Sequence, residues 1–290
     1  MKKVVGLGAC VLDTLITCDT YPTEDTKKRS QGTAVTGGGP VANALVVMSK
    51  LGIEAHAIGN FGSDSAGKYI LDDFVRYDVN VDGASVIQGA TSFTSYVLLA
   101  ADKATRTCVF DRGTVPDSPE KICMSQIDGA SILHLDGNYL ECAIAAARYA
   151  KERGVKVSLD AGGLYEGIAR LLPYVDLLIP SAEFAMGITG EKDIPGAMAK
   201  LFASYGPEVL VVTDGASGGY YWDGKRAVHY DSVKVKAVDT NGAGDTFHGA
   251  FVAAYVNGAS TAKACDFASK VAGYKCANKG LRELDFSMFR

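Results

Sequence analysis

The sequence predicts an α/β fold in which a mostly parallel central sheet carries helices on both faces, giving three layers. Short apolar runs recur along the chain and are separated by segments of helix length, which is typical of strands buried on both faces of a parallel sheet. The 290 residues are 48% hydrophobic and 21% charged, so the chain is long enough to bury one large core. We therefore expect residues 1–290 to form a single α/β domain.

In the first half of the chain, apolar runs and punctuating residues mark the elements. Residues 4–11 form a short apolar run that predicts the first strand. A helix is predicted over 40–51, because Pro40 is favoured at the first helical position and Gly52 is typical just past the last one. The other elements expected in this half are a strand near 55–59 and a helix over 65–77.

The alternation continues through the second half. A helix over 138–153 is followed by Gly154, a typical stop signal. Asp-Gly at 223–224 indicates a β-hairpin, and a further strand is expected to end near 237–240. The apolar runs that predict the remaining strands are 131–135, 155–160, 176–180 and 208–213.

Two segments, 13–36 and 91–112, interrupt this alternation of predicted strands and helices. They lack helical periodicity and are rich in Thr, Val, Ser and Tyr. A hairpin turn is predicted at 101–105. We expect the two segments to form a small β-sheet that stands off the main layer.

Charge and cysteine content narrow the classes of function. The net charge of −4 and the pI near 5.6 argue against nucleic acid or an anionic membrane as a partner. The seven cysteines include no C-x-x-C pair, as in a reduced cytoplasmic protein. No stretch reaches about 18 uninterrupted apolar residues, so we expect neither export nor membrane insertion.

Residues 237–251 read as a strand end, a glycine turn and the start of a helix. Gly242 and Gly244 allow a ligand to approach the main chain closely. The free amides of residues 242–245, with the positive end of the helix dipole behind them, suit a phosphate group. Asp245 stands where a carboxylate could accept a proton from an alcohol, although it could also serve only as a helix cap.

A second glycine run precedes the helix predicted at 40–51. Gly37, Gly38 and Gly39 expose backbone amides, and Asn43, one turn into the helix, offers both a donor and an acceptor to a hydroxyl. Asp13, just past the first predicted strand, could accept hydrogen bonds from a second hydroxyl. The alternative is a structural turn with a surface Asn and Asp.

Two further strings only approximate known phosphate-binding motifs. The run from Gly6 begins like the dinucleotide fingerprint but has Val11 in place of its third glycine. The run from Gly62 to Lys68 fits a P-loop, yet Tyr69 stands where a Ser or Thr must hold Mg²⁺. We therefore assign neither a nicotinamide site nor a P-loop.

The strings GGGPVAN at 37–43 and DTNGAGDTFHGAF at 239–251, in that order, resemble the ribokinase (PfkB) family of sugar kinases over the whole chain. Within that family the chain looks most like the ketohexokinase and sulfofructose kinase branch. The supporting strings are TYPTED at 20–25, TRTCVFD at 105–111 and KVAGYKCANKG at 270–280.

The resemblance implies a three-layer ribokinase-like fold and an ATP-dependent kinase. Asp245 would be the base, and Gly242, Ala243 and Gly244 would complete the anion hole. The resemblance places Asp13, Gly38, Gly39 and Asn43 around the sugar, with Asp25 reaching the sugar of a neighbouring subunit. The residues that it places near the nucleotide are Arg106, Ser181, Thr213, Gly215, Asn278 and Gly280.

The resemblance also implies cofactors and an assembly. Mg²⁺ is expected, because two polyanions cannot meet an alcohol without charge neutralisation. The family element N-x-x-E, which organises Mg²⁺, falls at 181–184, where this chain has Ser181 and Phe184 in its two defining positions. Whether K⁺ assists near Asp239 and Thr240 stays open. The small β-sheet would be a lid over the site and the contact of a homodimer.

The predicted reaction is transfer of the γ-phosphate of ATP to a hydroxymethyl group of a ketose-like sugar. Pro40 stands where ketohexokinases carry an asparagine, which leaves ribose, a nucleoside or a sulfofructose-type sugar as alternative acceptors. A sugar sensor without catalysis is disfavoured, because Asp245 and both turn glycines are present.

Overall fold

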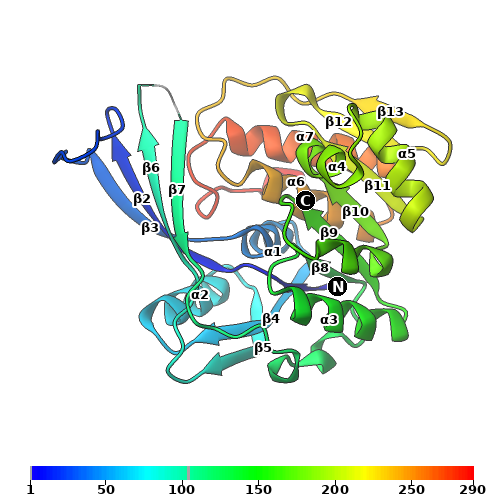
Figure 1. The fold of residues 1–290 in the computed structure, drawn as a ribbon, viewed down its shortest axis with the longest axis horizontal. Coiled ribbons are helices and arrows are strands. Elements are labelled where there is room, and N and C mark those ends of the chain that lie inside the picture. Colours follow the sequence, from blue (N-terminus) through cyan, green and yellow to red (C-terminus); the bar gives the residue numbers. More distant parts are fainter. Residues whose placement is uncertain (1, 103–104) are drawn as a thin grey trace.

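The computed structural model describes residues 2–102 and 105–290. Its main body is built on a nine-stranded sheet, and a smaller sheet stands apart from that body (Figure 1). Neighbouring strands of the main sheet run parallel except at one end, where β11, β12 and β13 pair antiparallel. In spatial order the strands are β13 (Ala227–Tyr230), β12 (Gly219–Trp222), β11 (Val209–Thr213), β10 (Leu177–Pro180), β9 (Lys156–Ala161), β8 (Ile132–Leu135), β1 (Lys3–Leu7), β4 (Glu54–Gly62) and β5 (Asn80–Ile87).

Helices cover both faces of the main sheet and divide the core in two. Successive strand residues point to opposite faces, so Val4 belongs to one buried cluster and Val5 to the other. One cluster is completed by α1 (Pro40–Lys50), α2 (Ser65–Arg76), α6 (Ala243–Val256) and α7 (Thr261–Cys276), and the other by α3 (Leu140–Glu152), α4 (Ala182–Thr189) and α5 (Ile194–Tyr205). The predicted three-layer α/β fold is confirmed.

The helices begin and end close to the residues that predicted their ends. Pro40 is the first residue of α1, and Gly52 follows it with a φ of 84°. The helix predicted over 138–153 begins at Leu140 and is followed by Gly154. No helix among residues 2–102 and 105–290 is long and apolar enough to cross a membrane.

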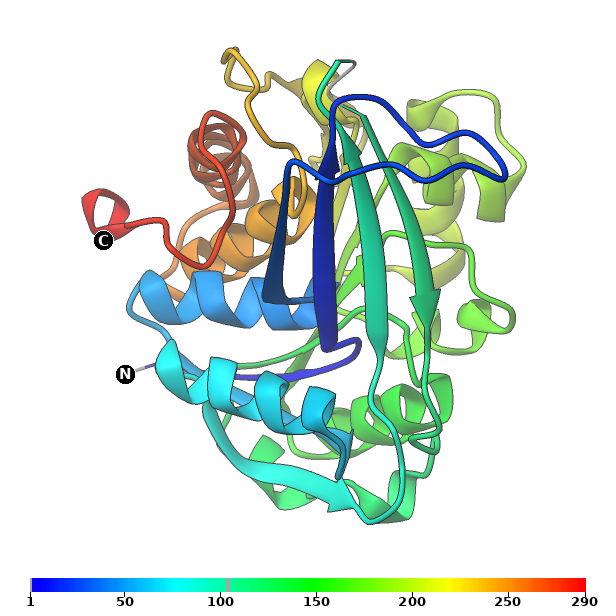
Figure 2. The ribbon, with the colours of Figure 1, turned by 90° about the vertical axis from the view of Figure 1, so that its left-hand side faces the viewer.

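The smaller sheet has four strands, in the order β3 (Gly32–Gly38), β2 (Val11–Cys18), β6 (Thr94–Ala100) and β7 (Thr105–Asp111). It takes its strands from the two segments that lack helical periodicity. Figure 2 shows this sheet face-on, with the irregular connection between β2 and β3 crossing in front of the upper part of β6 and β7. Of the hairpin turn predicted at 101–105, residues 103 and 104 lie outside the described residues.

Two predicted strands differ from the structure. The run at 4–11 is divided, because β1 ends at Leu7 in the main sheet and β2 begins at Val11 in the small one. At the break the amide of Ala9 donates to Asp136 Oδ2 at 2.8 Å. The strand expected to end near 237–240 is absent from the described chain, since β13 ends at Tyr230 and residues 231–242 form no strand.

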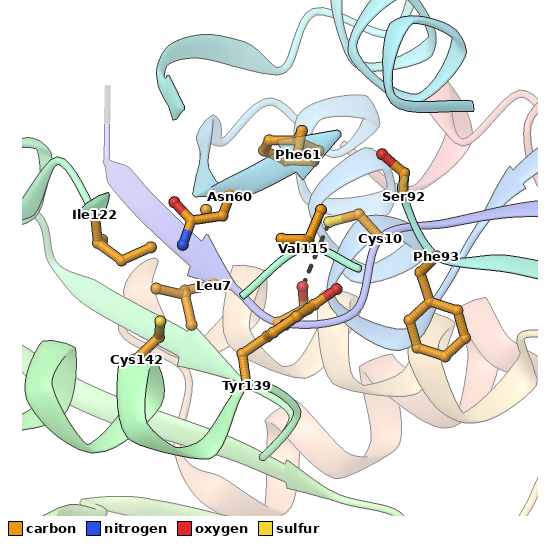
Figure 3. A pocket seen from close by; sticks show the side chains of 12 residues that line it. Leu7, Cys10, Asn60, Phe61, Ser92, Phe93, Val115, Ile122, Tyr139 and Cys142 are labelled. Atoms are coloured by element: carbon orange, nitrogen blue, oxygen red, sulfur yellow. Dashed lines mark hydrogen bonds between the residues drawn. The ribbon is translucent and has the colours of Figure 1, made fainter. Parts of the chain in front are cut away.

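A small cavity lies where the chain passes between the two sheets (Figure 3). Its lining includes Cys10, Phe93 and Val115, which come from the three connecting segments. Its volume is about 10 Å³, room for no more than one water molecule. None of the residues predicted for sugar or nucleotide binding lines it, so we place the functional site elsewhere.

Candidate active site

The glycine turn before α6 presents unpaired backbone amides. Gly242 has a φ of 75°, a left-handed conformation that glycine adopts without strain, and α6 begins at the next residue. The amide of Ala243 donates to the Thr240 carbonyl at 3.2 Å. The amides of Gly242, Gly244 and Asp245 have no acceptor within residues 2–102 and 105–290. Together with the helix dipole they form an anion-binding group.

The space in front of this turn is open. A Cβ atom added to Gly244 would meet nothing within 4 Å. Gly244 has no positive φ, so a glycine is not required here by the backbone conformation. Its role is to leave the neighbouring amides accessible, because it has no side chain. A phosphate group can therefore approach the first turn of α6 from this side.

The two glycine motifs meet at the carboxylate of Asp245. Asn43 lies in the first turn of α1, and its Nδ2 donates to Asp245 Oδ2 at 2.5 Å. The other end of the same amide, Asn43 Oδ1, accepts from Arg282 Nη1 at 2.7 Å. Residues from α1, α6 and the C-terminal segment thus converge on one point.

Asp13 lies on β2 beside the second glycine run. Its Oδ1 accepts a hydrogen bond from Ser95 Oγ at 2.5 Å, and a side chain on Gly38 would collide with its carboxylate. Burial raises the pKa of Asp13, and the charge of Asp245 adds to this, while the Ser95 hydrogen bond and the Arg282 charge oppose it. The charge of Asp245 therefore reaches Asp13 across the space between the two glycine motifs.

A buried ion pair lies behind the glycine run. Arg282 Nε is 2.8 Å from Asp73 Oδ2, and the two side chains are only 6% and 5% exposed. Neither residue carried a signal in the sequence, because Asp73 reads as an ordinary polar position of an amphipathic helix and Arg282 lies in a C-terminal segment without periodicity. They are functional candidates that sequence reasoning missed.

His248 ties α6 to the carboxyl ends of the central strands. Its Nδ1 lies 2.7 Å from the Gly244 carbonyl and 3.2 Å from Asp160 Oδ2, and its Nε2 lies 2.9 Å from the Ile179 carbonyl. Because both nitrogens face oxygens, only the protonated ring can donate in both directions. Burial raises the pKa of Asp160 to about 7, with the charges of Asp245 and Asp136 adding to the effect and His248 opposing it.

Arg112 follows β7 and points to the loop after β8. It donates to Asn138 Oδ1, and its guanidinium lies 5.9 Å from the ring centre of Phe93 and 6.0 Å from that of Tyr165. Asn138 is held in turn by Asp136, which accepts from its amide at 2.9 Å. In the described part of the chain Arg112 forms no ion pair.

The residues predicted near the nucleotide lie after β10 and at and after the end of β11, in the C-terminal segment after α7, and on β7. Ser181 caps α4 through Phe184 N at 3.1 Å and pairs with Thr213 in a parallel bridge. Gly280 N donates to Asp239 Oδ2 at 2.9 Å, which joins the C-terminal segment to the loop before α6. The others are Gly215, exposed after β11; Asn278, whose Nδ2 donates to the Tyr274 carbonyl at 2.8 Å; and Arg106, exposed on β7.

Asp25 lies on the exposed connection between β2 and β3, with a φ of 54°. Its side chain and that of Arg106 make no hydrogen bond or ion pair with the part of the chain that the structure describes. The structure thus brings together Asp13, Gly38, Asn43 and the turn at 242–245, while Asp25 and Arg106 stay outside this group.

The element at 181–184 does not form a metal site. The Ser181 hydroxyl is used as a helix cap, and Phe184 is buried in the core at 1% exposure. Among residues 2–102 and 105–290 no group of three or more His, Cys, Asp or Glu side chains is arranged to hold a metal ion.

Comparison with known proteins identifies a family and a fold. The model of pfkB family carbohydrate kinases matches residues 1–286. An ATP-dependent ribose-1-phosphate kinase of Halopiger xanaduensis is 25% identical over 97% of this chain and 94% of its own length. A ribokinase of Staphylococcus aureus is 26% identical over 96% and 95%. The structure of Arabidopsis thaliana ribokinase complexed with ribose and ATP superimposes with a TM-score of 0.84 at 25% identity, covering 96% of this chain and 93% of that one.

Proposed function

The chain belongs to the pfkB family of carbohydrate kinases and is a phosphotransferase with an alcohol group as acceptor, and we propose that it phosphorylates a primary hydroxyl of a pentose sugar with ATP. One observation carries the proposal. Asp245 stands in the first turn of α6, beside three unpaired amides and in hydrogen-bond contact with Asn43 of the other glycine motif. This arrangement joins a proton acceptor to a phosphate-binding group.

In the proposed reaction the acceptor hydroxyl oxygen attacks the γ-phosphorus, and the bond from that phosphorus to the β,γ-bridging oxygen breaks. Asp245 Oδ2 is occupied by Asn43, so Oδ1 receives the proton of the hydroxyl. The amides of Gly242, Gly244 and Asp245 stabilise the charge on the transferring phosphoryl group. ADP leaves with the electron pair of the broken bond, and Mg²⁺ supplies the remaining charge neutralisation.

The sugar would lie between Asp13 and Asp245. Asp13 accepts hydrogen bonds from ring hydroxyls, and Gly38 leaves room for its carboxylate. We propose ribose ahead of a ketose, because the similar proteins named above are kinases of ribose or of its phosphate. Pro40, which has no polar side chain to offer a ketose, agrees with this choice.

The nucleotide would lie along the loops after β11 and α7. Thr213, Gly215, Asn278 and Gly280 come from these loops, and Gly280 is bound to Asp239 ahead of the turn. In our proposal the adenine lies near 276–280 and the phosphates reach toward Gly244.

The small sheet would act as a lid and as the contact of a homodimer. Asp13 and Ser95 are on the face that binds the sugar, and the next cross-strand row points to the other face. In that row Val35, Tyr96 and Val109 are 49%, 53% and 64% exposed. Such an apolar stripe across a sheet is typical of an interface, so Tyr96→Lys should shift the mass measured by light scattering from dimer to monomer.

A second candidate substrate is a sugar that carries an anionic group. The position of Arg112 favours it. Arg112 directly follows β7, which lies two strands from β2, so its backbone is roughly 10 Å from that of Asp13 at ordinary strand spacing. The side chains that its guanidinium contacts, Asn138, Phe93 and Tyr165, are neutral. A planar guanidinium in this position suits a phosphate or carboxylate on the far end of a sugar.

The experiment that tests the proposal is ADP release from ATP and Mg²⁺ with a panel of ribose, ribose 1-phosphate, ketoses and nucleosides. The proposal expects ribose to have the highest kcat/KM and Arg112→Met to leave that value unchanged. If ribose 1-phosphate is preferred and Arg112→Met weakens its use by about tenfold or more, the second candidate replaces the first. Absence of ADP release with every sugar and nucleoside would refute both.

A further inference from the structure

Three buried side chains, Asp73, Arg282 and Asn43, connect α2 to the proposed base. Asp73 Oδ2 is 2.8 Å from Arg282 Nε, Arg282 Nη1 is 2.7 Å from Asn43 Oδ1, and Asn43 Nδ2 is 2.5 Å from Asp245 Oδ2. We infer that Asp73 and Arg282 are positioning residues that fix the Asn43 amide and, through it, the carboxylate of Asp245. The inference rests on the proposed function and adds residues that do not touch the substrate.

The contact with Asp245 depends on which end of the Asn43 amide faces its carboxylate. A guanidinium only donates hydrogen bonds, so Arg282 must meet the amide oxygen. The amide nitrogen then faces Asp245 and donates to its carboxylate. Without Arg282 the amide oxygen loses this donor, and the amide is then held against Asp245 only by its own hydrogen bond to that carboxylate.

Gly37 makes room for this ion pair. A side chain at Gly37 would collide with the Asp73 carboxylate and would lie 2.9 Å from Arg282 Nη2. Gly38 points to the other face of β3, where a side chain would collide with Asp13. The two adjacent glycines therefore leave room for different parts of the site. Gly37 leaves room for the ion pair of Asp73 and Arg282, and Gly38 leaves room for the carboxylate of Asp13.

A single substitution in the pair would leave an unpaired charge in the core, because both side chains are almost completely buried. Replacing both partners with apolar residues of similar size avoids this, since such replacements are often neutral for stability. The double variant Asp73→Leu/Arg282→Met therefore separates positioning from folding. Gly37→Ala tests the same pair by a second route, and Gly38→Ala is its matched control.

The test is a comparison of kcat and of the sugar KM, with thermal unfolding measured on each protein. We expect the double variant and Gly37→Ala to lower kcat by about tenfold or more, with the sugar KM within about threefold of wild type. Gly38→Ala should mainly raise the sugar KM. Wild-type kcat in a double variant that folds, or in Gly37→Ala, overturns the inference. An inactive wild-type protein would instead refute the proposed function.

A second, independent observation concerns the loop before the phosphate-binding turn. Lys275 is fully buried at 0% exposure, and its Nζ lies 2.8 Å from the Asp239 carbonyl oxygen and 2.9 Å from Asp239 Oδ2. Asp239 also accepts from Asn241 N at 2.9 Å, directly before Gly242. The ammonium group thus organises the backbone that leads into the anion hole.

These contacts do not fit a potassium ion at this place. A monovalent cation near Asp239 would need the same carbonyl and carboxylate oxygens, and the Lys275 ammonium already binds both. We propose that Lys275 is an internal cation that takes the place of K⁺, so that the enzyme has no monovalent cation requirement.

The test is the kcat of the wild-type protein with K⁺ and with tetramethylammonium at equal ionic strength. We expect equal values, and we expect Lys275→Met to lose activity that NH₄⁺ or K⁺ partly restores. Stimulation of the wild-type protein by K⁺ of several-fold or more overturns the proposal, whether or not Lys275→Met folds. Inactivity of the wild-type protein with both salts would instead argue against the proposed kinase function.

Discussion

The buried carboxyl group of Asp160 should make the stability of the fold depend on pH. Its side chain is 6% exposed, and burial is the main cause that raises its pKa from 3.8 to about 7. The folded protein therefore holds a proton that the unfolded chain releases above about pH 4. The stabilisation from this proton is fully present below about pH 4 and is lost as the pH rises through about 7.

The size of the change in the free energy of unfolding follows from the pKa shift of Asp160. A rise from 3.8 to about 7 is roughly three pKa units, and at about 1.4 kcal/mol per unit it corresponds to a loss of about 4 kcal/mol. The opposing effect of His248, whose Nδ1 lies 3.2 Å from Asp160 Oδ2, is already included in this value.

The assay is urea unfolding of the wild-type protein and of Asp160→Asn between pH 4 and pH 8. Other ionisable groups contribute to both curves, so the informative quantity is the difference between the two free energies of unfolding at each pH. We expect the wild-type protein to lose about 4 kcal/mol relative to the variant across this range. Parallel curves for the two proteins would refute the reasoning.

Three further predictions concern activity. Asp245→Asn should fold normally and bind the sugar while its kcat falls by about 10²–10⁴-fold, and near-normal turnover would contradict the role of the carboxylate. Gly244→Val should leave thermal stability almost unchanged, because a Cβ there meets nothing within 4 Å, but should lower nucleotide turnover by obstructing the amides; unaltered kinetics would argue against that geometry. Removal of Mg²⁺ with EDTA should abolish ADP release and added Mg²⁺ should restore it, whereas full activity in EDTA would contradict the proposed charge neutralisation.

Local signals were sufficient to predict most of the fold. Pro40 and Gly52 delimit α1 because their effects on the backbone act within one or two residues. The division at Gly8 was not predictable in this way. There the chain turns because Asp136, which is distant in the sequence, binds the amide of Ala9 at 2.8 Å.

A strand was predicted to end near 237–240, and residues 232–237 ahead of that point alternate between polar and apolar. A strand also needs a partner edge, and in the described chain β13 ends at Tyr230 without one continuing beside this segment. Its backbone is fixed instead by Cys276, whose carbonyl accepts from the amide of Val238 at 2.7 Å. Alternation alone therefore could not separate a strand from an extended loop.

The glycine motifs predicted which loops meet at the candidate site, but not what lies behind them. The ion pair of Asp73 and Arg282 joins residues with no common motif and depends on how α2 and the C-terminal segment pack. The third glycine, Gly37, is explained only once that pair is seen. The resemblance to the ketohexokinase branch rested on three short strings, at 20–25, 105–111 and 270–280, whereas the relatives named above, which match almost the whole chain, are kinases of ribose or its phosphate.

The most direct test of the account is a crystal structure with a non-hydrolysable ATP analogue, Mg²⁺ and the sugar. The account predicts that oxygens of the γ-phosphate lie within hydrogen-bond distance of the Gly244 and Asp245 amides, with a primary hydroxyl of the sugar against Asp245 Oδ1. A γ-phosphate bound away from the first turn of α6 would contradict it.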